Sequence, residues 1–289
     1  MQHQASGLRM AASVFVLSLA GFHAAATPVA TRPAASLLAS HLLVTWYGNP
    51  HSAAMGVLGQ AEGEARAAAL RGQAACYAPL TAKRVLPAFH LVAVVAQKTA
   101  GTDGRWRRRE SLELMTALLA EARRYGFALV LDVQPGRSTV ADEIQYLLPM
   151  LAEPDVHLAL DPEFAMSEGQ RPGGAIGHMH ASEINAALDA VERVRLARAL
   201  PPKVVIVHQF TIGMLPDKPE IRARGGIDLV LDMDGFGPRP LKRASYRAVN
   251  RQFALPFAGF KLFYRQDTNL FDPAEVMQLE PLPSVVIYQ

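Results

Sequence analysis

Eight short apolar runs divide this chain of 289 residues, and most of them end at a polar or acidic residue. Buried strands of this length that alternate with helical stretches are typical of a (β/α)8 barrel, whose site lies at the carboxyl ends of the strands. The sequence therefore predicts an α/β fold, a single TIM barrel with one pocket where the runs end. The runs are Leu42–Tyr47, Leu91–Ala96, Ala128–Val133, Val156–Leu160, Val204–Val207, Ile227–Leu231, Phe260–Tyr264 and Val285–Tyr288.

The eighth run comes last in the chain, and we expect no eighth helix after it. It should pair with Leu42–Tyr47 and so close the barrel. An open doubly wound sheet is the alternative, but no G-x-G-x-x-G turn follows the first run. Pro87 precedes the second run, and because proline cannot donate a ladder hydrogen bond we expect that strand to begin after it.

The first residues have the pattern of an export signal. Arg9 is followed by the apolar stretch Met10–Phe22 and then by the small residues Ala24–Ala26. We therefore predict a signal peptide at 1–26, a lead-in segment at 27–40 and the barrel domain at 41–289. The apolar stretch is short for a membrane span. We expect a secreted, periplasmic or cell-surface protein with no stable span after cleavage, and an uncleaved anchor is the alternative.

The composition excludes several classes of protein. The formal charge is only +3, and the single dense basic run, Arg105–Arg109, has no nucleic-acid-binding module beside it. We therefore expect no nucleic-acid partner and place this run at the solvated start of a helix. Cys76 is the only cysteine, which excludes an internal disulfide and a cysteine-based metal cluster. The oligomeric state does not follow from the sequence.

The sharpest motif is Asp161-Pro162-Glu163, directly after the fourth run. In an extended chain, side chains two residues apart share one face. Two close carboxyl groups push their pKa values apart, so that one keeps its proton while the other is charged. This is the arrangement that acid–base cleavage of a glycosidic bond requires. In the alternative, Asp161 caps the following turn and Glu163 pairs with an arginine.

Other strand ends supply further candidates. Asp232 and Asp234 repeat the same spacing, and Gly235 allows the backbone to approach a ligand closely. We predict catalytic roles for Glu163, Asp161 and Asp234, with no metal and no cofactor. The predicted substrate-binding residues are Tyr47, Asp132, Gln134, Arg137, His208, Gln209, Asp232, Tyr264 and Asp267.

The motif Asp161-Pro162-Glu163 resembles the D-x-E at the fourth strand of exported (β/α)8 glycoside hydrolases, the chitinase-like and lysozyme-like muramidase barrels. This resemblance implies that Glu163 is the proton donor and Asp161 its partner. It also implies a polysaccharide or other glycan of the cell wall or extracellular space as substrate. The longer chitinase pattern D-x-x-D-x-D-x-E is absent, because Val156 and Ala159 stand where two aspartates belong.

Two other functions stay open at this point. The chain could be a non-catalytic, wall-associated barrel that binds glycan, since a fold does not fix a function. It could also be a metal-dependent hydrolase of the phosphodiesterase type, with Asp161, Glu163, His208 and Asp232 around a divalent ion. The absence of a second clear histidine at a strand end argues against the metal-dependent hydrolase.

Overall fold

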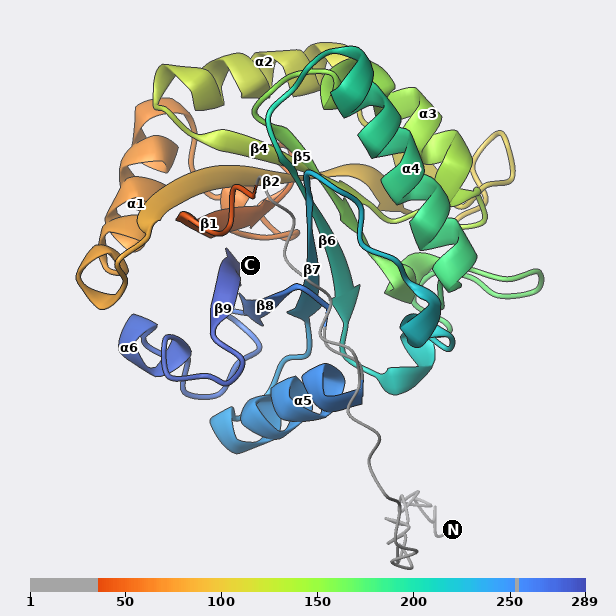
Figure 1. Ribbon diagram of the computed structural model, residues 1–289. Helices are drawn as coiled ribbons and strands as arrows, with labels where there is room; N and C mark the ends of the chain where they lie inside the picture. The colour runs from red at the N-terminus through yellow and green to blue at the C-terminus, as the bar shows by residue number, and fades with distance from the viewer. Residues whose placement is uncertain (1–35, 253–254) are drawn as a thin grey trace, which may run out of the picture.

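The computed structural model describes residues 36–252 and 255–289, and its core is a closed barrel of eight parallel strands (Figure 1). The first strand, β1, pairs on one side with β2 and on the other with the last strand, β9. The predicted TIM barrel and its closure by the C-terminal strand are confirmed. The barrel strands are β1 His41–Gly48, β2 Arg84–Ala96, β4 Ala128–Val133, β5 Val156–Leu160, β6 Lys203–Gln209, β7 Ile227–Met233, β8 Phe257–Leu262 and β9 Pro283–Tyr288.

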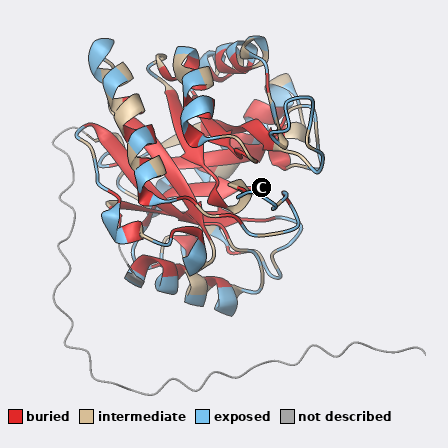
Figure 2. Ribbon diagram, turned by 90° about the vertical axis from the view of Figure 1, so that its right-hand side faces the viewer, coloured by how far each residue is buried: buried red, intermediate tan, exposed pale blue. Residues whose placement is uncertain are grey.

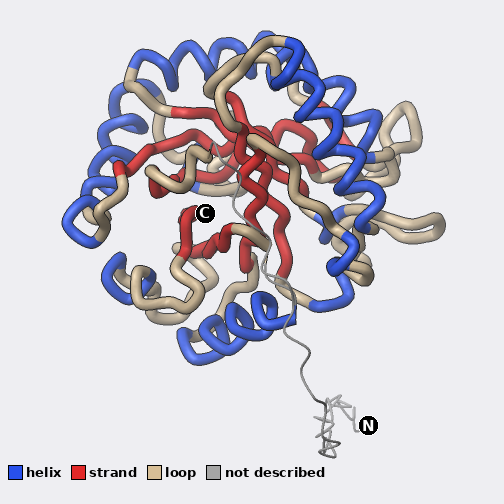
Figure 3. Tube along the Cα trace, viewed as in Figure 1, coloured by secondary structure: helices blue, strands red, loops and turns tan. Residues whose placement is uncertain are grey.

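Helices surround the barrel on its outer side (Figure 3). The helix α2 shows why: Met115, Leu118, Leu119 and Ala122 recur at helical spacing and are buried. Ser111 caps this helix by accepting a hydrogen bond from the Leu114 amide. The six α-helices in the described part of the chain are α1 Gly63–Ala75, α2 Leu112–Arg124, α3 Val140–Leu151, α4 Ala181–Ala197, α5 Arg239–Gln252 and α6 Pro273–Val276.

The strands bury both faces, so the barrel has one apolar layer inside and one outside (Figure 2). Alternate residues of a strand point to opposite faces. In β6, Val204 and Ile206 belong to the inner layer, whereas Val205 and Val207 pack under the helices. At the start of the barrel, Leu38 joins the inner layer, and its amide donates to Asp228 Oδ2 over 2.7 Å.

The structure corrects two predicted strand bounds. β2 begins at Arg84 and includes Pro87, which lies opposite Val44 of β1. Pairing of β2 with β4 starts only at Ala88, so Pro87 has β1 on one side and no strand on the other. The missing N–H of the proline therefore removes no hydrogen bond to β4. β8 runs from Phe257 to Leu262 rather than from Phe260 to Tyr264. The small residues at 258 and 259 interrupt the apolar pattern, and the prediction therefore placed the start of this strand too late.

The basic run is not the start of a helix. Residues Arg107–Arg109 form the short strand β3, which lies antiparallel to β2. Arg107 and Arg109 both form ion pairs with the buried Glu143 of α3, at 2.8 and 2.7 Å. This run therefore attaches the β2–α2 connection to a neighbouring helix.

Among residues 36–252 and 255–289, no helix is both long and apolar enough to cross a bilayer. The predicted signal peptide at 1–26 lies outside the described residues, and so does most of the lead-in segment at 27–40. The predicted location of the protein stays a prediction.

Candidate active site

Seven of the eight barrel strands, all except β9, place a buried polar or ionisable side chain inside the barrel near their carboxyl ends. Inward-pointing residues of neighbouring strands meet near the carboxyl ends, where TIM barrels place their sites. These residues are Tyr47, His90, Asp132, Asp161 (directly after β5), His208, Asp232 and Lys261, and we call them the polar ring.

His208 lies at the centre of the polar ring, between carboxylates from two strands. Its Nδ1 is 2.9 Å from Asp232 Oδ2, and its Nε2 is 3.4 Å from Asp132 Oδ2. Burial alone would lower the pKa of His208, but the two carboxylates outweigh it and raise this pKa well above its usual value. In the same way burial would raise the pKa of Asp132, but the charge of His208 overcomes it and the pKa is lowered.

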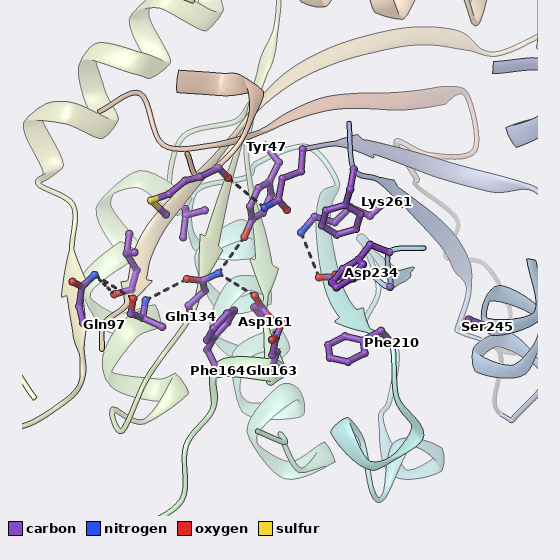
Figure 4. Close-up of a pocket in the computed structure, with 18 of the residues that line it drawn as sticks. Tyr47, Gln97, Gln134, Asp161, Glu163, Phe164, Phe210, Asp234, Ser245 and Lys261 are labelled. Carbon is purple, nitrogen blue, oxygen red and sulfur yellow. Dashed lines mark hydrogen bonds and ion pairs between the residues drawn. The ribbon is translucent and has the colours of Figure 1, made fainter. Parts of the chain in front are cut away.

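Lys261 is the second cation of the polar ring (Figure 4). Its Nζ lies 3.4 Å from Asp234 Oδ2 and 3.7 Å from the centroid of the Tyr47 ring. Burial alone would lower the pKa of this amine, but Asp234 and the carboxylates of the polar ring outweigh it and raise this pKa above its usual value. Lys261 is therefore a buried ammonium that balances carboxylates, and not a neutral amine.

Asp161 and Glu163 do not share a face of an extended strand as we expected. Pro162–Phe164 forms a turn of 3-10 helix, and Asp161 Oδ1 caps it by accepting from the Glu163 amide over 3.2 Å. Asp161 Oδ2 accepts from Gln134 Nε2 over 3.1 Å. Burial, together with the nearby Asp132 and Asp234, raises the pKa of Asp161 well above its usual value. The capping alternative for Asp161 is therefore the one that the structure shows.

A cavity of about 830 Å³ opens above the polar ring. It has the usual character of a small-molecule site, with apolar walls and a few convergent polar groups. The polar groups that line it include Tyr47, Gln97, Gln134, Asp161, Glu163, Asp234 and Lys261, and the apolar ones include Val92, Val95, Phe164, Phe210, Phe236 and Phe263 (Figure 4).

Glu163 lines this cavity with a carboxyl group that makes no hydrogen bond to any residue in the described part of the chain. Burial and the carboxylate of Asp234 raise its pKa, against the lowering effect of Lys261 and His208. Groups in a cleft whose pKa is shifted by their surroundings are candidates for proton transfer. Of the acidic residues around the cavity, Glu163 is the one best placed to meet a ligand.

The predicted site residues fall into three groups. Five of them line the cavity: Tyr47, Gln134, Asp161, Glu163 and Asp234. Three more, Asp132, His208 and Asp232, are fully buried in the polar ring and do not reach the cavity. Their predicted roles stay predictions, but the structure brings all eight together.

The remaining four lie elsewhere, which corrects their predicted place. Arg137 donates from Nε to the Gln170 carbonyl over 2.7 Å, lies over the Trp106 ring and does not line the cavity. Tyr264 is exposed and donates to Gln73, because the strand that was expected to carry it ends at Leu262.

Gln209 and Asp267 serve the framework of the barrel. Gln209 is buried, and its Oε1 accepts from the Nζ of Lys218 over 3.1 Å. Asp267 accepts from Lys242 Nζ over 2.7 Å and from the Phe263 amide over 2.9 Å. The acceptor oxygens of both side chains form hydrogen bonds within the protein.

Sequence reasoning missed two residues of the polar ring, His90 and Lys261. Each belongs to a strand whose start was placed too late, so that neither was recognised as an inward-facing residue. The available signal was a charged or polar residue inside an apolar run, since such residues are rarely buried without a partner.

Two groups of buried side chains could hold a metal ion, each with its donor atoms within 4.8 Å of one another. One consists of His90, Asp132 and His208, and the other of His208, Asp232 and Asp234. In the second group, His208 Nδ1 is at hydrogen-bond distance from Asp232, and Lys261 already lies beside Asp234. The first group is therefore the better candidate.

Comparison with known proteins gives a likeness in fold. No family model and no curated protein matches the sequence. The structure is similar to the crystal structure of 2,3-dimethylmalate lyase, a member of the PEP mutase/isocitrate lyase superfamily. The TM-score is 0.49 and the identity 14%, over 87% of this chain and 76% of that one. A likeness at this level concerns the barrel alone.

The expected kinship with exported glycoside hydrolases is withdrawn: no family model matches the sequence, and the solved structure named above shares only the barrel with it. The 3-10 turn at Pro162–Phe164 also removes the geometry on which the D-x-E resemblance depended. The predicted hydrolase, carbohydrate and cell-wall roles are withdrawn with it. The glycan-binding and phosphodiesterase alternatives have no better support.

Proposed function

We propose that the cavity is the active site of an enzyme that moves a proton at a carbon atom next to a carbonyl group of a small organic substrate. The observation that carries this proposal is the pairing, in one cavity, of an ammonium with spare donors and a carboxyl group without a hydrogen bond. These are Lys261 and Glu163.

Lys261 supplies the site for a substrate oxygen. Its ammonium group has three N–H donors. In the described part of the chain, Asp234 is its one hydrogen-bond acceptor, and the Tyr47 ring contacts it from one side. A donor left over in a cavity can bind a carbonyl oxygen and stabilise negative charge that develops there.

Glu163 supplies the base. A carboxylate is a stronger base when its pKa is raised toward the working pH, as burial and Asp234 do here. The four phenylalanines of the wall (Phe164, Phe210, Phe236 and Phe263) favour a substrate that has an apolar part beside its carbonyl group.

The proposed step balances without a redox partner. The Glu163 carboxylate takes the proton from the carbon atom, and the C–H electron pair forms the double bond of an enolate. The carbonyl π pair moves onto the oxygen, where the Lys261 ammonium stabilises it. Return of the proton from Glu163 to the same carbon atom restores the carbonyl compound.

Hydrogen–deuterium exchange tests this step directly. The protein is incubated in D2O with 2-oxo acids, hydroxy ketones and aryl ketones, and loss of the C–H signal is followed by proton NMR. We expect exchange with the parent protein and a rate lower by about 10²- to 10⁴-fold in Glu163→Gln. Ligand-observed NMR should show that Glu163→Gln still binds the compound.

Glu168→Gln is the matched control, because it makes the same change at an exposed residue outside the cavity. It should keep the parent rate. Exchange at equal rates in the parent and in Glu163→Gln, or no exchange of any compound by folded parent protein, would refute the proposal.

A further inference from the structure

Two histidine nitrogens and one carboxylate oxygen converge below the cavity. Nε2 of His208 is 3.4 Å, and Nε2 of His90 is 3.8 Å, from Oδ2 of Asp132. The three donor atoms lie within 4.8 Å of one another and come from β6, β2 and β4. Ligands about 2.0–2.2 Å from a tetrahedral zinc ion stand roughly 3.4 Å apart, close to these separations.

These donor atoms have no hydrogen bonds, although they are fully buried. His90 Nε2, His208 Nε2 and both carboxylate oxygens of Asp132 lack a hydrogen-bond partner, and all three side chains are 0% exposed. Buried polar groups are nearly always satisfied, so such a cluster needs an explanation, of which an ion is one.

The other nitrogen of each imidazole is already engaged. His208 Nδ1 lies 2.9 Å from Asp232 Oδ2, and His90 Nδ1 lies 3.3 Å from Thr45 Oγ1. Histidines that bind metals almost always place their second nitrogen against a carboxylate, carbonyl or water, which fixes the ring and its tautomer. Asp232 has this position for His208, and Thr45 orients His90. Both rings therefore turn Nε2 toward Asp132.

We propose that His90, Asp132 and His208 bind one divalent transition-metal ion. Two imidazoles with one carboxylate favour zinc, iron, cobalt or manganese over magnesium and calcium, which prefer oxygen ligands. An imidazole binds a metal ion through a nitrogen that carries no proton, so binding of the ion would release any proton held at these nitrogens.

The ion would lie behind Tyr47 rather than in the cavity. The Tyr47 ring lines the cavity and packs edge-on against His90 at 4.9 Å and against His208 at 6.3 Å between centroids. None of the three proposed ligands lines the cavity. The site would thus join three strands and hold Tyr47 in place, without contact with the substrate.

Metal loading tests the proposal independently of any activity. Because the ligands are buried, the full chain is refolded from urea with excess chelator or with Zn²⁺ and then freed of loose metal. We expect one zinc per chain by mass spectrometry of the metal, and a melting temperature that rises with the concentration of free zinc. Cobalt in place of zinc should give the absorption bands of a four- or five-coordinate site without thiolate charge transfer.

His90→Gln and Asp132→Asn should each reduce the zinc affinity at least 100-fold, while circular dichroism shows that they fold. His180→Gln is the matched control: this histidine also lies beside an aspartate, Asp217 at 3.2 Å, but it is half exposed. Thr45→Val changes only the orientation of His90 and should weaken binding about 10- to 100-fold.

Three results would overturn the proposal. They are a parent protein that is refolded with zinc but retains less than one ion per chain, full zinc binding in a folded His90→Gln or Asp132→Asn variant, and a cobalt spectrum with thiolate bands from Cys76. If both ligand variants fail to fold, the zinc affinity of Thr45→Val and the cobalt spectrum of the parent test the proposal, and an unchanged affinity in Thr45→Val would refute it.

Discussion

Lys261 Nζ lies 3.7 Å from the centroid of the Tyr47 ring, so that an ammonium ion rests on an aromatic face in the interior of the barrel. The ring quadrupole attracts the cation, and this attraction is strongest where water is excluded. The same ammonium faces Asp234 at 3.4 Å. The buried ammonium of Lys261 is therefore stabilised by an aromatic ring and a carboxylate together.

Removal of Lys261 and Asp234 together should cost less unfolding free energy than the two single removals added. Lys261→Met leaves the buried Asp234 with His208, 3.4 Å away, as its remaining cationic partner, and should cost up to about 3–5 kcal/mol of unfolding free energy. Lys261→Met with Asp234→Asn should lose less than the sum of the single changes, with a coupling energy of about 0.5–3 kcal/mol. Urea unfolding of the four proteins measures this.

The exposed pair Arg224–Asp189 is the control cycle, with its atoms at 2.6 Å and its side chains partly in solvent. Its coupling energy should be no more than about 1 kcal/mol. Equal coupling energies in the two cycles would show that burial does not strengthen the Lys261–Asp234 pair.

A second prediction concerns Gly259, which leaves room for Asp232. A Cβ atom at position 259 would lie 2.8 Å from Asp232 Oδ1 and 3.1 Å from its Cβ. Gly259→Ala should displace Asp232 from His208 and destabilise the fold by about 1–3 kcal/mol, the usual cost of overpacking.

Gly72→Ala makes the same change in α1, where a Cβ meets nothing within 4 Å. This variant should be more stable than the parent by roughly 0.5–1 kcal/mol, since alanine replaces glycine inside a helix. Thermal unfolding of both variants measures these changes in stability. If Gly259→Ala were as stable as the parent, β8 would move away from Asp232 without loss of stability.

The strand ends were predictable, because short continuous runs of aliphatic residues mark strands that are buried on both faces, as in a parallel barrel. Asp132, Asp161, His208, Asp232 and Asp234 all follow or end such runs, and the structure brings them together. What these residues do was not predictable in the same way. Two carboxylates spaced D-x-E fit a glycosidase only if the chain stays extended, and Pro162 starts a 3-10 turn instead.

His90 and Lys261 were missed for a related reason. Pro87 suggested a late start for β2, so that His90 fell just before the predicted run Leu91–Ala96. Lys261 lay inside the predicted run Phe260–Tyr264 and not at its polar end, because that run was placed too far along the chain. Proline is tolerated in β2 because no strand pairs with its second side there. Such tolerance depends on the register of three strands, which one sequence does not display.

Asp267 offers a test of structural against binding roles. The sequence suggested that it binds substrate, but its carboxylate accepts from Lys242 Nζ at 2.7 Å and from the Gly237 amide at 2.9 Å. Asp267→Asn should lower the unfolding free energy by about 3–5 kcal/mol, because it leaves the buried lysine without a charged partner. Any ligand of the cavity found in the exchange experiment should keep its affinity at a temperature where the variant is folded.

The pH dependence of stability gives the last prediction, and its sign follows from Glu163. Burial, then Asp234, raises the pKa of this carboxyl group above its usual 4.5, so the folded protein disfavours the charged form more than the unfolded chain does. The contribution of Glu163 to stability is therefore fully present below pH 4.5 and is lost as the pH rises through the raised pKa. Glu163→Gln should be more stable than the parent at pH 8, and this advantage should shrink as the pH falls to 4.

The deuterium exchange rate of the parent should rise as the pH increases from 4 to 8, because the base acts only when it is ionised. Chemical unfolding of the parent, Glu163→Gln and the exposed control Glu168→Gln between pH 4 and 8 measures how the unfolding free energy of each variant differs from that of the parent. An advantage of Glu163→Gln that grows toward low pH would mean that the fold stabilises the charged carboxylate, and Glu163 would then lose its role as the base.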